Sequence, residues 1–182
     1  MIVFEAIGKE NTAATVDIAL KKAKELDCAI VLSSNSGASA EAVLKKASEV
    51  GYTGKVVVVR NASNAAMMLP ESRKALEARG CTVVAAANAL SAGERSLSTR
   101  LKGIYPLEIM AYTLRIFGQG VKVCVECATM ALDADAVPSN TPVVALGGTG
   151  VGLDTAVVLT PSVSASLLDT KIHEVLCKPG LY

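Results

Sequence analysis

Four apolar runs, separated by segments of helical spacing, constrain the fold of this chain more than any other feature. The runs CAIVLSS, KVVVVRN, CTVVAAA and PVVALG lie at residues 28–34, 55–61, 81–87 and 142–147. Strands that are apolar along their whole length are buried on both faces, as in parallel sheets covered by helices. The sequence therefore predicts an α/β protein, a three-layer sandwich around a mostly parallel sheet.

A fifth strand is predicted at residues 154–160, DTAVVLT, very close behind the fourth. A parallel connection needs about a dozen or more residues, so this strand should return antiparallel to the fourth. The expected sheet has five strands in the order 3-2-1-4-5, with strand 5 antiparallel. Residues 171–179, KIHEVLCKP, alternate enough to form a further short strand at the edge.

Helices are predicted between the strands, where amphipathic segments begin or end at Gly and Pro. Gly51, Gly80 and Pro138 mark three of the ends. The expected helices cover residues 13–26, 36–51, 70–80, 93–102, 107–117 and 121–137. Residues 88–119 are the least regular part and are interpreted as a helical insertion. No repeat or linker divides the chain, so residues 1–182 are expected to form a single domain.

Composition excludes some classes of protein. Lys and Arg number 18 and Asp and Glu 17, giving a net charge of +1, which argues against nucleic-acid binding through bulk positive charge. No apolar run approaches the roughly 20 residues of a spanning helix, and the first residues lack the basic region of a signal peptide. We expect a cytoplasmic protein with no membrane or nucleic-acid partner. Its 51% hydrophobic content favours a homo-oligomer.

Ligands of open parallel sheets bind at the carboxyl ends of the strands. The Ser-rich turn SSNSGAS, residues 33–39, follows the first strand there and leads into a helix. Hydroxyl groups and free backbone N–H groups at a helix start form an anion site, although Ser and Asn also serve simply as helix caps. Residues 60–64, 88–96 and 147–152 and a helix start near Val121 reach the same edge.

The glycine loop GGTGVG, residues 147–152, does not match either standard nucleotide motif. Both the dinucleotide fingerprint and the Walker loop fail at position 153, where Leu stands in place of Gly or Lys. A strand follows the loop instead of a helix. Taken alone, the loop is therefore better interpreted as a hairpin turn.

Few residues suggest catalysis or metal binding. Cys124 and Cys127 have C-x-x-C spacing, but no second such pair exists and His173 is the single histidine, so buried structural thiols are expected rather than a metal site. Glu126 and Asp133 share one helix face, and a solvated acidic stripe is the simpler interpretation. Catalytic residues stay unknown at this point.

In order and spacing, the segments resemble the carboxy-terminal domain of pyruvate kinase. The resemblance rests on ATVDIALKKAKELDCAIVLSSNSGASAEAV, KVVVVRN and VVALGGTGVGLDTAVVL, and covers roughly residues 13–87 and 121–160. It implies that the Ser-Gly turn and the final glycine loop hold the phosphates of an effector. The chain lacks the catalytic barrel domain of that enzyme, so pyruvate kinase activity is not expected. Ala38 stands where a basic residue often follows the Ser-Gly pair.

The stretches GERS, IYP, FGQG and GGTGVGLDTA are similar to a smaller family of stand-alone proteins resembling that domain. This resemblance implies a bound phosphorylated nucleotide, with flavin mononucleotide (FMN) as the best candidate and no metal. The candidate ligand-binding residues are Ser33, Ser34, Asn35, Ser36, Gly37, Ser39, Arg60, Asn61, Gly147, Gly148, Thr149, Gly150, Val151 and Gly152.

Three hypotheses follow from the sequence. The first is a binding domain for a phosphorylated small molecule or FMN, with Arg60 or Arg95 as a counter-charge. The second is a flavin-dependent oxidoreductase of unknown substrate that uses the insertion. Its candidate residues are Glu94, Arg95, Tyr105 and Glu126. The third is an oligomeric regulatory or scaffold module.

Overall fold

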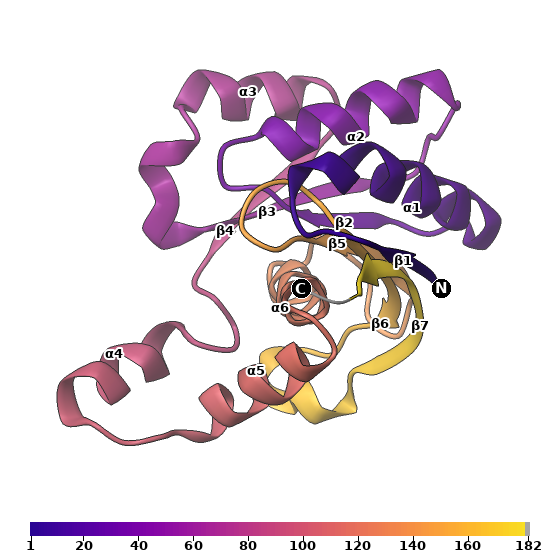
Figure 1. Ribbon diagram of the computed structural model, residues 1–182. Coiled ribbons are helices and arrows are strands. Elements are labelled where there is room, and N and C mark those ends of the chain that lie inside the picture. The colour runs from indigo at the N-terminus through magenta and orange to yellow at the C-terminus, as the bar shows by residue number, and fades with distance from the viewer. Residues whose placement is uncertain (181–182) are drawn as a thin grey trace.

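A mixed sheet runs through the middle of the protein, with helices on both faces (Figure 1). The computed structural model describes residues 1–180, and in them the sheet has seven strands in the order β1-β7-β6-β5-β2-β3-β4. The strands are β1 (Ile2–Phe4), β2 (Ile30–Ser33), β3 (Val56–Asn61), β4 (Thr82–Ala86), β5 (Val143–Gly147), β6 (Thr155–Thr160) and β7 (Lys171–Pro179).

The expected five-stranded sheet is therefore too small. The five strands follow one another in the expected order, and β6 runs antiparallel to β5, but β7 and β1 extend the sheet beyond β6. Strand β7 is internal, because it pairs with β6 on one side and with β1 on the other. Three residues of β1 are too few to show a periodic pattern, and their pairing with β7 fixes them as a strand.

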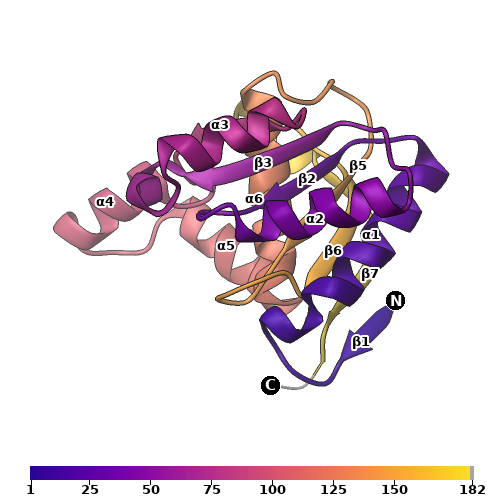
Figure 2. The same ribbon diagram turned by 90° about the horizontal axis from the view of Figure 1, so that it is seen from above.

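Helices cover the two faces of the sheet unequally (Figures 1 and 2). α1 (Thr12–Leu26), α2 (Ala38–Glu49) and α3 (Pro70–Ala78) lie on one face, and α6 (Gln119–Asp133) lies on the other. α5 (Pro106–Ile116) packs against α6, and α4 (Ala92–Leu101) extends outward beside α5. Short 3-10 turns complete the chain at η1 (Lys9–Asn11), η2 (Ala62–Met67) and η3 (Ser164–Asp169).

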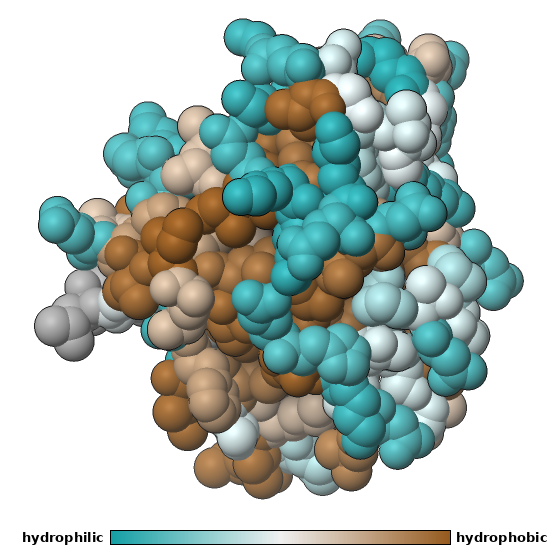
Figure 3. Space-filling model, turned by 90° about the vertical axis from the view of Figure 1, so that its right-hand side faces the viewer, coloured by the Kyte–Doolittle hydropathy of each residue, from teal (hydrophilic) through white to brown (hydrophobic). Residues whose placement is uncertain are grey.

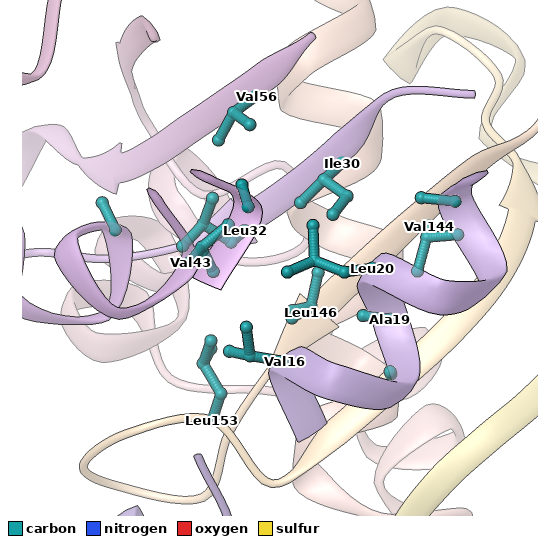
Figure 4. Close-up of a cluster of buried hydrophobic side chains, with 14 of the residues drawn as sticks. Val16, Ala19, Leu20, Ile30, Leu32, Val43, Val56, Val144, Leu146 and Leu153 are labelled. Atoms are coloured by element: carbon teal, nitrogen blue, oxygen red, sulfur yellow. The ribbon is translucent and has the colours of Figure 1, made fainter. Parts of the chain in front are cut away.

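Each face of the sheet has its own core, since successive strand residues point to opposite sides. Ile30 of β2 packs with Leu20 of α1 and Leu146 of β5 beneath the first helix layer (Figure 4). Val31, the next residue of β2, joins the second core under α6. Leu153 closes the glycine loop by inserting its side chain into the first core near Val16.

Some of the large apolar side chains are exposed at the surface of the protein. No helix among the described residues is long and apolar enough to cross a membrane. Apolar side chains gather on the face seen in Figure 3, which carries β1 and β7. Ile2, Val3 and Ile172 of these strands are exposed. Further exposed apolar residues lie on α4 and α5, within the predicted insertion.

Candidate functional site

A cavity of about 550 Å³ opens at the carboxyl ends of β2, β3 and β5. Its volume falls within the roughly 300–1,000 Å³ of small-molecule sites. The sequence-predicted residues that line it are Ser33, Ser34, Asn35, Ser36, Ser39, Asn61, Gly148, Gly150, Val151 and Gly152. Gly37, Arg60, Gly147 and Thr149 are not among its lining residues. The serine turn and the glycine loop thus face the same space.

The serine turn is shaped by its own hydrogen bonds. Ser34 Oγ accepts from Gly37 N–H at 3.1 Å, and Ser36 Oγ accepts from Ala38 N–H at 3.4 Å, so these two hydroxyls hold the entry into α2. Asn35 Oδ1 accepts from Asn61 N–H at 2.9 Å and joins the turn to the end of β3. The turn is therefore held by its own side chains at the entry into α2 and also forms one wall of the cavity.

The glycine loop between β5 and β6 is organised by Asp154, whose side chain is buried. Its Oδ2 accepts from Thr149 N–H at 3.0 Å and from Gly8 N–H at 3.1 Å, and Thr155 Oγ1 donates to Oδ1 at 2.8 Å. Gly152 has a φ of +81°, and a Cβ there would press on the backbone of Lys9. The loop is thus fixed between Asp154 and the N-terminal segment.

The third wall is the first half of α6. The start of this helix near Val121 was expected at this edge and Glu126 was a candidate residue, but Lys122 was not predicted. Lys122 and Glu126 line the cavity, are almost completely buried and form an ion pair one helical turn apart. Glu126 Oε1 also accepts from Leu90 N–H at 3.0 Å, which joins α6 to the loop before α4. The i, i+4 spacing of a Lys and a Glu in the sequence is the signal that could have identified this pair.

Two arginines from the insertion complete the cavity, and only one of them was predicted. Arg95 of α4 was expected as a counter-charge, whereas Arg115 of α5 was not. Arg115 Nε donates to Gln119 Oε1 at 2.7 Å, and its guanidinium lies 5.0 Å from the centre of the Tyr112 ring. With Lys122, the cavity has three cationic side chains.

Arg60, the other expected counter-charge, does not face this site, because successive residues of a strand point to opposite faces of the sheet. Asn61 lines the cavity, and Arg60, one residue earlier in β3, belongs to the opposite face of the sheet. Its Nε and Nη1 atoms are buried and have no hydrogen-bond partner in residues 1–180.

The residues proposed for catalysis do not converge. Glu126 and Arg95 line the cavity, but Glu94 and Tyr105 do not. Glu94 Oε2 instead accepts from Glu108 N–H at 2.9 Å, at the start of α5. Asp133 is exposed and accepts a hydrogen bond from the backbone of η3. His173, on the exposed part of β7, contacts Thr160 of β6. Of the two acidic residues on α6, Glu126 therefore lines the cavity and Asp133 lies at the surface.

The five cysteines are buried free thiols. Burial raises the pKa of Cys127, which lies at the floor of the cavity, to about 12, and raises that of Cys124 well above its ordinary range. Both groups are neutral thiols near pH 7, whereas redox pairs and metal sites need accessible thiolates. No group of three or more His, Cys, Asp or Glu side chains with metal-site geometry occurs within residues 1–180.

We expect the folded protein to react very slowly with a thiol reagent such as Ellman's reagent, and the unfolded protein to react at all five cysteines. The raised pKa of the buried thiols also gives the stability a pH dependence. The buried thiols contribute fully to the free energy of unfolding below the unfolded thiol pKa of about 8.5, and this contribution is lost as the pH rises above it. Guanidinium unfolding should therefore show lower stability at pH 10 than at pH 7. Rapid labelling of two thiols in the folded state would contradict the burial.

No protein-family model matches this sequence. The arrangement of the cavity is therefore the basis for the functional argument.

Proposed function

We propose that the protein binds a phosphorylated small molecule at the carboxyl edge of the sheet. One observation carries this proposal: a single cavity is bounded by the N-terminal turns of α2 and α6, by a glycine loop and by two arginines. The first N–H groups of a helix lack acceptors within the helix and carry its positive dipole end, which favours bound anions.

The charge of the cavity supports the same ligand class. Arg95, Arg115 and Lys122 contribute three positive charges and Glu126 one negative charge, which leaves two positive charges in the cavity. The whole chain has a net charge of only +1, so positive charge is concentrated there. A phosphate monoester carries about two negative charges at neutral pH and would balance this excess.

FMN is the ligand that we favour. Its phosphate would lie against the serine turn and the glycine loop, where small residues permit close approach of the backbone. Its ring would lie against the apolar part of the lining, which includes Val59, Met67 and Met130. The resemblance to stand-alone proteins like the pyruvate kinase carboxy-terminal domain supports this choice.

The direct test is to purify the protein, record its absorbance in the flavin region and identify released small molecules by mass spectrometry. We expect FMN, released on denaturation in proportion to the protein. A released sugar phosphate would keep the phosphate site and exclude FMN as its ligand. A protein that contains no phosphorylated molecule and binds neither FMN nor inorganic phosphate on titration would overturn the proposal.

The replacement Arg95→Gln should weaken FMN binding about tenfold or more, since a hydrogen bond to a charged group contributes roughly 1.5–3 kcal/mol. Arg100→Gln is the matched control, because Arg100 is also exposed on α4 but does not line the cavity. The measurement is quenching of flavin fluorescence at two salt concentrations. Equal losses of FMN affinity in the two variants would mean that the general charge of the protein, and not the cavity, attracts the ligand.

A further inference from the structure

Helix α5 is apolar on two opposite sides. Its inner side packs against the body of the protein through Ala111, which is buried, and through three partly buried residues: Leu107, Met110 and Leu114. Its outer side presents Ile109, Tyr112 and Ile116, which are 55%, 61% and 81% exposed. The outer residues are spaced three and four apart, so they form one stripe. A helix that is apolar all round is normally buried, yet half of α5 faces solvent.

Helix α4, which contacts α5, also exposes apolar side chains. It has no buried residue, and Leu97 and Leu101, one turn apart, are 51% and 65% exposed. Ile104 and Phe117, at the two ends of α5, are also mostly exposed. Isolated helices shorter than about 12–15 residues are marginal in water, so a ten-residue helix with no core of its own needs a partner surface.

The size of this surface is close to that of one side of a protein interface. Seven large apolar side chains are at least half exposed across residues 97–117. At roughly 100 Å² each, they present roughly 700 Å², against about 800 Å² per partner in a standard interface. The largest apolar patch of a typical monomer is roughly 300–600 Å². The α4–α5 surface is therefore larger than solvent exposure alone explains.

We propose that the α4–α5 surface is the interface of a symmetric homodimer, in which the two α5 helices pack against each other. A two-fold axis places the same patch on both partners, so an apolar stripe such as Ile109, Tyr112 and Ile116 meets its own copy. A net charge of +1 creates little repulsion between two chains. A lipid surface fits less well, because membrane-bound helices keep a polar face and the second face of α5 is already packed.

Another apolar surface competes for this role. Ile2 and Val3 of β1 and Ile172 of β7 are about half exposed. This edge offers fewer apolar residues, and β1 is only three residues long. We therefore place the dimer interface on α4 and α5 and use β1 as the control surface.

The interface would also affect the ligand site, a consequence that rests on the proposed phosphate binding. Arg95 and Arg115 line the cavity from the same two helices whose outer sides form the interface. Association would order these helices and hold both guanidinium groups at the cavity. Ligand binding and dimerisation would then strengthen each other by thermodynamic linkage.

The test compares Ile109→Glu with Ile2→Glu, since these isoleucines are 55% and 51% exposed in the single chain. Sedimentation velocity on the full chain, without ligand, should show a dimer for the unaltered protein and for Ile2→Glu. Ile109→Glu should be a monomer with an unchanged far-ultraviolet circular dichroism spectrum. Ile116→Glu should also be a monomer, and it serves as the second variant if Ile109→Glu does not fold.

Three outcomes would overturn the interface: an unaltered protein that is monomeric at high micromolar concentration, dissociation by Ile2→Glu alone, or a monomer that co-sediments with phospholipid vesicles. Titration with FMN then tests the linkage, because Ile109→Glu should bind FMN more weakly than Ile2→Glu does. A dimer through α4–α5 that binds neither FMN nor phosphate would contradict the proposed function and leave the interface standing.

Discussion

Replacing Lys122 with methionine should lower the free energy of unfolding by about 3–5 kcal/mol, the usual cost of removing one partner of a buried ion pair. Lys122 and Glu126 are almost completely buried, so Glu126 would lose its counter-ion in a place that water hardly reaches. The same helix contributes residues to both the cavity lining and the second core. Guanidinium unfolding followed by circular dichroism measures the change.

The double replacement Lys122→Met with Glu126→Gln is the control. Glutamine keeps an amide oxygen that can accept from Leu90 N–H, and no carboxylate is left without a partner. Much of the lost stability should therefore return. If the single and double variants are equally unstable, the ion pair is not the reason for the loss.

Gly120→Ala should lower the free energy of unfolding by about 3 kcal/mol, at the upper end of the usual effect of overpacking a core. A Cβ at Gly120 would overlap the side chain of Thr155, and a Cβ at Gly147 would overlap the backbone carbonyl of Gly120. Thr155 cannot rotate away without breaking its hydrogen bond to Asp154. The first turn of α6 would therefore move off the sheet and distort the cavity.

Gly93→Ala is a closely matched control, because Gly93 and Gly120 are both the second residue of a helix. Apart from its chain neighbours and the backbone of its own helix, no atom lies within 4 Å of the position that a Cβ at Gly93 would take. Alanine there should leave stability unchanged or raise it by roughly 0.5–1 kcal/mol through its helix propensity. Thermal melts of the two variants separate crowding from propensity. Equal melting temperatures of the two variants would show that α6 can shift without loss of stability.

The strands of this protein could be predicted where burial leaves a continuous apolar run. Residues 28–34 and 142–147 contain β2 and β5, and the short link after β5 correctly predicted the antiparallel turn. Two strands were misjudged because pairing, not pattern, defines them. Strand β1 has only three residues, and β7 lies inside the sheet only because β1 covers its outer side.

The candidate site was predictable as a location but not as a set of charges. The rule that ligands bind at the carboxyl ends of strands identified the serine turn and the glycine loop, and both line the cavity. It could not place Arg115 or Lys122, because helices α5 and α6 bring these side chains to the cavity and the rule considers only the strand ends. Strand alternation could have excluded Arg60 once Asn61 had been chosen.

The two main walls of the cavity should form at different times during folding. The bond from Asn61 N–H to Asn35 in the serine turn spans 26 residues, whereas the glycine loop depends on contacts from Gly8 to Asp154 and from Leu153 to Thr12, which span 146 and 141 residues. Contacts between distant parts of a chain form slowly, because closing a long loop costs entropy before any interaction is gained. During synthesis, the serine turn would form first. The cavity would be complete only after the N-terminal segment has packed against the glycine loop.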